Sequence, residues 1–271
     1  MTSDTPTIDP RMTNLDGFRV EIDVERERAD VILARPPMNV IAMPQRDEIR
    51  KVFEALDEDP RVRVIVLRAE GEHFSSGGYI KGFLDASPEH VSKLAWNMAA
   101  PARCSKPVIA ANRGYTFGVG FEISLACDFR IVSETCRYAL PEQKLGQIPG
   151  SGGSARLQKI VGITRTKDIV MRSKRIPGRQ ALDWGIATEC VPDADLEKAT
   201  DASWRNCAPS RPSPSAPPRS SSTTPRTRAC PSPSSSKDTA TAAFVRPTTS
   251  ARASRRSTPS ARRASPAHSP A

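Results

Sequence analysis

Residues 112–128 read Asn112-Arg-Gly-Tyr-Thr-Phe-Gly-Val-Gly-Phe-Glu-Ile-Ser-Leu-Ala-Cys-Asp128, a glycine-rich turn followed by an apolar helical segment. The apolar run from Pro107 to Asn112 predicts a short buried strand before the turn. Glu122 is the one acid within residues 120–127, so its side chain is expected to be buried. A buried carboxylate needs a partner or a raised pKa, and on the residues alone an ion pair with an arginine explains Glu122 as well as catalysis does.

A second glycine-containing segment precedes this stretch. It runs from His73 to Lys81, reads His-Phe-Ser-Ser-Gly-Gly-Tyr-Ile-Lys, and follows an expected strand at residues 62–67. Small residues at strand-to-helix turns leave backbone N–H groups free, and N–H groups from two turns can converge on one oxygen as an oxyanion hole. For glycine-rich turns taken alone, a purely structural turn is the commoner explanation.

A third segment follows, and it holds a second glutamate. Residues 140–153 read Leu-Pro-Glu-Gln-Lys-Leu-Gly-Gln-Ile-Pro-Gly-Ser-Gly-Gly. Glu142 comes directly after Pro141 near an expected helix start, where a surface carboxylate can simply stabilise the helix N-terminus. The structural and the catalytic interpretation of Glu142 both stay open at this point.

The wider pattern is that of an α/β chain, in which strands alternate with helices. Strands are expected at residues 18–24, 29–33, 62–67, 107–112 and 129–132. Helices are expected at residues 45–58, 89–103, 120–127, 152–161, 164–173 and 178–184. Residues 1–17 predict a flexible leader that lacks the apolar run of a signal peptide, and no stretch is apolar for long enough to cross a membrane. Six scattered cysteines without a CxxC pair indicate reduced thiols in a cytoplasmic protein.

The formal charge of +10 is concentrated at the C-terminal end of the chain. Residues 205–271 hold 12 of the 40 Lys and Arg and one of the 30 Asp and Glu, so their formal charge is +11. Residues 1–204 hold the other 28 basic and 29 acidic residues, so their formal charge is −1. A nearly neutral body does not support a groove for nucleic acid. Nucleic-acid binding through the arginine-rich end is the least favoured function.

The composition changes abruptly near Ser203. Residues 205–271 contain no Leu, Ile, Met, Tyr, Gly, Glu or Gln, and consist almost entirely of Pro, Ser, Thr, Ala and Arg. Such a segment buries too little apolar surface to offset a chain entropy of about 1–2 kcal/mol per residue. We therefore expect residues 201–271 to form a disordered tail after a core at residues 18–200.

The three glycine-containing segments resemble the signature of the crotonase (enoyl-CoA hydratase/isomerase) superfamily. The resemblance lies in Phe74-Ser-Ser-Gly-Gly-Tyr-Ile-Lys81, in Gly118-Val-Gly-Phe-Glu-Ile-Ser-Leu-Ala-Cys-Asp128 and in Pro141 to Gly153, in that order and spacing. It extends over roughly residues 18–200 and implies a ββα spiral superhelix. The family's usual C-terminal helices are replaced here by the tail.

The resemblance also implies roles for particular residues. Glu122 and Glu142 match the two catalytic glutamates of hydratases, the backbone N–H groups of Ser76 and Val119 match the oxyanion donors, and the Gly150 N–H matches a group that places the attacking water. Residues implied at the CoA or acyl site are Asn39, Val40, Ser75, Gly77, Gly78, Tyr79 and Ile80. Tyr79 departs from the aspartate usual at its position.

The function implied is hydration of a 2-enoyl-CoA to a 3-hydroxyacyl-CoA by a lyase of fatty acid metabolism. Coenzyme A enters as part of the substrate, no metal or separate cofactor is implied, and the family implies a homotrimer or hexamer. Two alternatives stay open: an isomerase or hydrolase of a related, alicyclic acyl-CoA, and a catalytically impaired acyl-CoA-binding protein. Which glutamate is the acid and which the base does not follow from the sequence.

The tail suggests a frameshift. Codons permitted for residues 248–261, read one base earlier, can spell Asp-Asp-Phe-Arg-Glu-Gly-Val-Glu-Ala-Phe-His-Ala-Lys-Arg, which is similar to the usual end of crotonase chains. We therefore hypothesise that the tail is a shifted translation of the family's C-terminal helices. A genuine basic disordered tail is the alternative, and sequencing of the gene decides between them.

Overall fold

A mostly parallel β-sheet is the centre of the computed structural model, which describes residues 9–83 and 87–207. Its strands lie in the order β1–β2–β3–β4–β6–β9. Strands β1 and β2 are antiparallel, and all the remaining neighbouring pairs are parallel. The strands are β1 (Phe18–Asp23), β2 (Arg28–Leu33), β3 (Val64–Ala69), β4 (Val108–Asn112), β6 (Phe129–Ser133) and β9 (Glu189–Val191). The central strand β4 is buried along its whole length, as is usual inside a parallel sheet.

A smaller sheet lies beside the larger one and turns the chain into a spiral. Its strands are β5 (Tyr115–Phe117), β7 (Arg137–Ala139) and β8 (Ile176–Pro177). Twice a strand of the larger sheet leads into a strand of the smaller sheet and then into a helix, first as β4–β5–α5 (Val119–Ser124) and then as β6–β7–η3 (Pro141–Leu145)–α6 (Gly153–Met171). A bridge between Ser75 and Thr116 brings the segment after β3 against the same smaller sheet. This confirms the predicted crotonase-type ββα fold, and it gathers the ends of successive repeats at one place.

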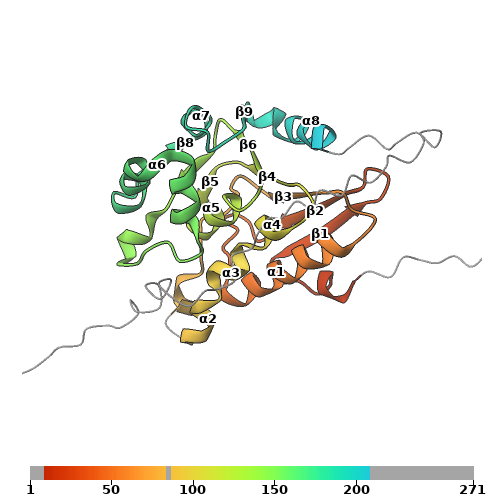
Figure 1. The fold of residues 1–271 in the computed structure, drawn as a ribbon, viewed down its shortest axis with the longest axis horizontal. Helices are drawn as coiled ribbons and strands as arrows, with labels where there is room; N and C mark the ends of the chain where they lie inside the picture. The colour runs from red at the N-terminus through yellow and green to blue at the C-terminus, as the bar shows by residue number, and fades with distance from the viewer. Residues whose placement is uncertain (1–8, 84–86, 208–271) are drawn as a thin grey trace, which may run out of the picture.

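Helices cover both faces of the larger sheet (Figure 1). On one face, Ile49 and Phe53 of α1 (Met43–Glu58) pack in a core with residues of β2 and β3. On the opposite face, Leu196 and Ala199 of α8 (Leu196–Cys207) pack with residues of β3, β4 and β6. The shorter helices are η1 (Pro10–Met12), η2 (Ile80–Phe83), α2 (Pro88–Ser92), α3 (Leu94–Met98), α4 (Ala100–Arg103), α7 (Gly178–Asp183) and η4 (Asp193–Asp195).

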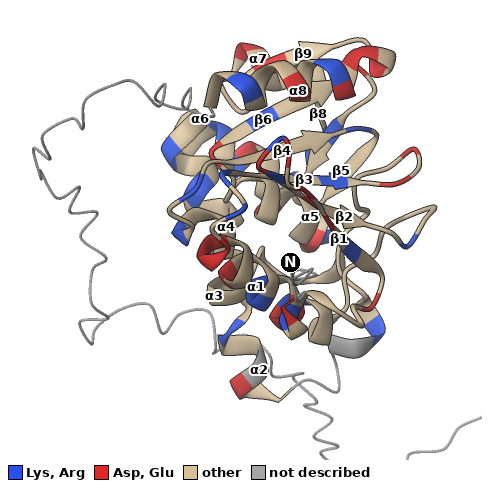
Figure 2. Ribbon diagram, turned by 90° about the vertical axis from the view of Figure 1, so that its right-hand side faces the viewer, with Lys and Arg blue, Asp and Glu red and all other residues tan. Residues whose placement is uncertain are grey.

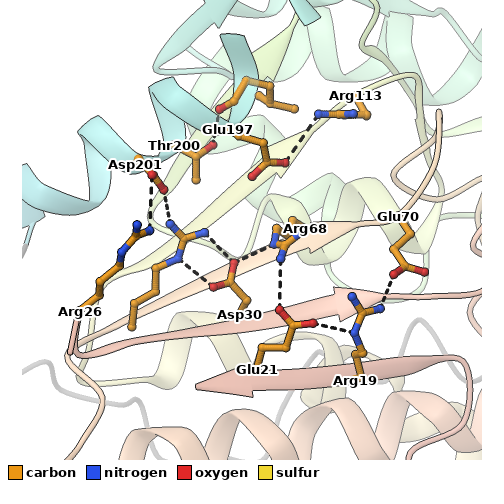
Figure 3. A network of polar contacts seen from close by, with 12 residues as sticks. Arg19, Glu21, Arg26, Asp30, Arg68, Glu70, Arg113, Glu197, Thr200 and Asp201 are labelled. Atoms are coloured by element: carbon orange, nitrogen blue, oxygen red, sulfur yellow. Dashed lines mark hydrogen bonds and ion pairs between the residues drawn. The ribbon is translucent and has the colours of Figure 1, made fainter. Parts of the chain in front are cut away.

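A network of ion pairs ties α8 to the strands at the edge of the sheet (Figure 3). Arg28 on β2 is buried and pairs both with Asp201 on α8 and, at 2.7 Å, with Asp30. Arg68 on β3 pairs with the same Asp30 carboxylate at 2.8 Å. Because each buried charge has an opposite charge against it, the network links α8, whose apolar side chains pack with residues of β3, β4 and β6, to Arg28 on β2.

The chain departs from the expected elements at its two ends. Helix α8 continues to Cys207, so the first seven residues of the segment expected to be a disordered tail, 201–207, are helical. Residues 208–271, with the segment of the frameshift hypothesis, lie outside the described residues. In the expected leader, η1 is ordered and its Met12 is buried in the core beneath α1.

One expected helix is subdivided in the structure, and two others are joined. The helix expected at 89–103 is three short helices, α2, α3 and α4. The helices expected at 152–161 and 164–173 correspond to the two parts of α6, which are separated by Gly162 at φ 79° and ψ 167°. These values lie outside helical geometry, so the separation in the prediction has a structural basis at Gly162.

Charges of both signs alternate over the described part of the molecule (Figure 2). Helix α1 carries arginines and a lysine together with aspartates and glutamates, and α8 is similarly mixed. None of the helices in the described ranges is both long enough and apolar enough to cross a membrane.

Candidate active site

A pocket of about 250 Å³ opens where the repeats of the spiral meet. Its walls come from α1, the segment after β3, the start of α5, and the chain between η3 and α6. Apolar side chains from Ile80, Val91, Leu94, Leu145 and Ile148 form much of the lining. Predicted site residues that line the pocket are Ser76, Gly77, Gly78, Ile80, Val119, Glu122, Glu142 and Gly150.

Glu122 is buried on α5, as its place in an apolar run predicts. Its Oε1 accepts two backbone hydrogen bonds, from the Ser151 N–H at 2.8 Å and the Gly153 N–H at 2.9 Å. Gly153 allows this approach, because a Cβ at residue 153 would lie 2.5 Å from Glu122 Cγ. Burial raises the pKa of Glu122, and the two N–H donors and the positive charge of Arg46 oppose that rise.

Glu142 lies in η3 with its carboxyl in the same pocket but in a different environment. Its Oε2 is buried and has no hydrogen-bond partner among the described residues. Burial and the nearby negative charge of Glu122 raise the pKa of Glu142 from its ordinary 4.5 to about 7. Gly118 lies against this carboxyl, because a Cβ there would be 3.0 Å from Glu142 Oε1.

Arg46 is a charged residue of the pocket that the sequence analysis missed. It lies on α1, is only 2% exposed, and its Nη1 donates to Ser151 Oγ at 3.3 Å. Burial lowers its pKa to about 10, and the charges of Glu122 and Glu142 oppose that fall, so Arg46 stays protonated near neutral pH. A signal was present: Arg46 precedes Ile49 by three residues and Phe53 by seven, which places it on the apolar face of the helix.

The backbone donors differ in part from those predicted. The Ser76 N–H donates to the Met38 carbonyl at 2.8 Å, so the prediction of Ser76 as an oxyanion donor does not fit this geometry. The Gly78 N–H and the predicted Val119 N–H have no hydrogen-bond partner within the described residues, and both residues line the pocket. Gly77 and Gly118 lie close together, which brings the two turns into contact.

Four residues expected at the CoA or acyl site do not line this pocket. Asn39 is buried, and its side chain accepts from the Arg35 N–H at 2.8 Å and donates to two backbone carbonyls, so it fixes the turn after β2. Val40 follows it in the same turn. Ser75 is fully buried, and its Oγ accepts the Gly77 N–H at 3.2 Å. Tyr79 is 49% exposed outside the pocket.

The described residues contain no group of three or more His, Cys, Asp or Glu placed to hold a metal ion. Among the groups that line the pocket are two carboxyls, one guanidinium and free backbone N–H groups. Such a set can move protons and stabilise a developing negative charge on oxygen.

The chain is similar in sequence to known proteins. A family model described as enoyl-CoA hydratase/isomerase matches residues 25–216. A carnitinyl-CoA dehydratase of Shigella flexneri is 37% identical over 171 residues, 62% of this chain and 66% of its own length, so the chain spans less than two thirds of that relative.

Solved structures agree with the sequence comparison. An enoyl-CoA hydratase subunit of Geobacillus kaustophilus superposes with a TM-score of 0.67 at 28% identity, covering 72% of this chain and 76% of its own. A Thermobifida fusca protein in complex with CoA gives a TM-score of 0.65 at 27% identity, covering 70% of this chain and 77% of its own.

Proposed function

This chain belongs to the enoyl-CoA hydratase/isomerase family, and from that premise we propose that it adds water to the double bond of a 2-enoyl-CoA thioester and forms a 3-hydroxyacyl-CoA. The observation that supports hydration best is the pair of glutamates, Glu122 and Glu142, in one pocket but in contrasting environments. A water molecule that adds across a double bond must lose one proton and a second proton must reach the neighbouring carbon, so the reaction needs one basic and one acidic group.

Glu122 suits the basic role and Glu142 the acidic one. Two backbone N–H groups stabilise the Glu122 carboxylate, whereas the Glu142 carboxyl has a buried oxygen without a partner and a pKa of about 7. Two neighbouring carboxyls avoid being charged together, and the better hydrogen-bonded one keeps the charge. Glu122 would take a proton from the water molecule as the water oxygen attacks the β-carbon of the substrate. Glu142 would give its proton to the α-carbon.

The thioester oxygen carries negative charge between these two steps. We assign its stabilisation to the N–H groups of Gly78 and Val119, which are free of other partners in the described chain and belong to adjoining turns. Backbone donors aimed at the oxygen of a developing enolate lower the barrier without needing to reorganise. After turnover, the proton now on Glu122 must return to Glu142 before the next cycle.

The acyl group is proposed to be uncharged and apolar. The lining away from the two glutamates is aliphatic, with Leu94 and Ile148 among its members, and Arg46 adds a positive charge to the pocket. Curated relatives include carnitinyl-CoA dehydratases, and dehydration is the reverse of hydration with the same two proton transfers. Carnitinyl-CoA carries a quaternary ammonium group, which proteins commonly bind with aromatic rings, and none of the described lining residues is aromatic.

The test is incubation with crotonyl-CoA and with a ring-containing enoyl-CoA, followed by loss of the enoyl absorbance and by product mass. A hydratase product gains the mass of one water, whereas an isomerase product keeps the substrate mass. We expect Glu122→Gln and Glu142→Gln to abolish turnover and Glu189→Gln, an exposed residue on β9, to leave it unchanged. Full activity in both active-site variants would overturn the proposal.

The pH dependence provides a second test. Since Glu142 must be protonated and its pKa is about 7, kcat/KM should fall above neutral pH, approaching roughly tenfold for each pH unit. Assembly as a homotrimer or hexamer and a cytoplasmic location stay predictions, and gel filtration of the full chain tests the first of these.

A further inference from the structure

Arg46 is placed to act on the proposed base. Among the described residues that line the pocket it is the one cation, it reaches the pocket from α1, and it is almost completely buried. Burying a guanidinium is unfavourable unless neighbouring groups compensate, so a buried arginine beside two carboxyls calls for a role.

Ser151 connects Arg46 to Glu122. The Arg46 Nη1 donates to Ser151 Oγ at 3.3 Å, while the Ser151 backbone N–H donates to Glu122 Oε1 at 2.8 Å. The Ser151 carbonyl accepts from Arg156 Nη1 at 3.0 Å. All three polar groups of one buried serine are thus used to fix the segment that holds Glu122.

The charges around Glu122 come from three elements. Arg46 lies on α1, Arg156 on α6 and Glu142 on η3, and each interacts electrostatically with Glu122. The two arginines favour its charged form, and Glu142 disfavours it when ionised. Arg46 also favours the charged form of Glu142, but it has a hydrogen-bonded path, through Ser151, to Glu122.

We propose that Arg46 is a positioning residue that acts through Ser151 to keep the Glu122 carboxylate charged and fixed, so that the proton available to the pair stays on Glu142. The inference rests on the proposed roles of the two glutamates. A residue from a different helix, which itself need not touch the substrate, thus determines which of the two glutamates is the base and which is the acid.

The experiment is an NMR titration of isotope-labelled glutamate side-chain carboxyls in the full chain, with the two signals assigned by Glu122→Gln and Glu142→Gln. Arg46→Met removes the charge at similar length, Arg46→Lys keeps it, and Ser151→Ala removes the hydroxyl link but keeps the backbone N–H. Arg50→Met is the matched control, because Arg50 lies one turn along α1 and pairs with Asp47 and Glu54 at the surface.

In Arg46→Met, we expect the pKa of Glu122 to rise by about one unit or more, because a nearby cation stabilises a carboxylate by that amount. Arg46→Lys should recover part of this shift, Ser151→Ala should raise the pKa of Glu122 by a smaller amount, and Arg50→Met should have no effect. An unchanged Glu122 titration in Arg46→Met overturns the proposal. If Arg46→Met does not fold, an unchanged titration in Ser151→Ala overturns it instead.

The titration needs no turnover, so it tests Arg46 even if the wild-type chain hydrates no substrate and the proposed function fails. If hydration is observed, both limbs of the pH profile of kcat should move to higher pH in Arg46→Met, because loss of the cation raises the pKa of both glutamates. KM should change little. A loss of activity at every pH without such a shift indicates a merely structural role and refutes the proposal.

Discussion

Replacing Glu142 with glutamine should make the protein more stable, and increasingly so as the pH rises. A carboxyl whose pKa is higher in the folded than in the unfolded chain contributes stability that is complete below the unfolded value and is lost as the pH rises through the folded value. For Glu142 these two values are 4.5 and about 7. Glutamine has nearly the same shape and does not ionise, so the variant escapes this loss.

The magnitude follows from the same two values. Between about pH 5 and about pH 8, the wild type should lose about 2.5 kcal/mol of unfolding free energy through Glu142 alone, and Glu142→Gln should not. Urea denaturation of both proteins at the two pH values measures the difference, and comparing across pH cancels the uncharged effects of the substitution. Glu189→Gln, on the exposed part of β9, is the control.

The reasoning would be refuted if the stability difference between wild type and Glu142→Gln stayed the same at the two pH values. That result would mean that Glu142 ionises in the folded protein as easily as in the unfolded chain. The proposed acid would then be charged at neutral pH and unable to donate a proton.

Three other outcomes are expected. Gly153→Ala should lower kcat roughly a hundredfold with a smaller effect on KM, because the new Cβ would lie 2.5 Å from Glu122 Cγ and must displace the Glu122 carboxylate. A kcat equal to that of the wild type would show that the site tolerates the displacement of Glu122. Asp201→Asn should cost about 2 kcal/mol in urea denaturation by weakening the pairing of buried Arg28, and a cost equal to that of exposed Asp195→Asn would contradict this. An enoyl-CoA with a trimethylammonium group on its acyl chain should show kcat/KM lower than crotonyl-CoA by about tenfold or more, whereas equal values would exclude an uncharged preference.

The fold was predictable because several local patterns agreed. The crotonase-type core was predicted from apolar strands, helical spacing and three glycine-containing turns in order. The burial of Glu122 was predicted because this residue interrupts an apolar run. The three strands of the smaller sheet were missed, because segments as short as β5, β7 and β8 have too few residues for an alternating pattern to be visible. Helix α8 was partly assigned to the tail since its last turns have little apolar content.

The site was less predictable than the fold. A sequence motif indicates which turn supplies a backbone donor, but whether an N–H group is free depends on the acceptors that lie near it. The Ser76 N–H already donates to the Met38 carbonyl. The side chain of Asn39 likewise serves its own turn and does not line the pocket. Arg46 comes from a helix far from the motifs, so only the three-dimensional arrangement brings it to Glu122.

The ion pair between Arg28 and Asp201 has a consequence for how the chain folds as it is synthesised. From β1 to β6 each strand of the larger sheet joins a neighbour that has already left the ribosome, and β9 then joins β6, so the sheet can grow in order from the N-terminus. Arg28 has one partner, Asp30, only two residues away, but its second partner, Asp201, lies 173 residues further along the chain. A contact of such high sequence separation forms late and slowly. Until α8 emerges, the growing sheet therefore exposes an arginine and an apolar face that a chaperone could recognise, and completion of α8 would end that exposure.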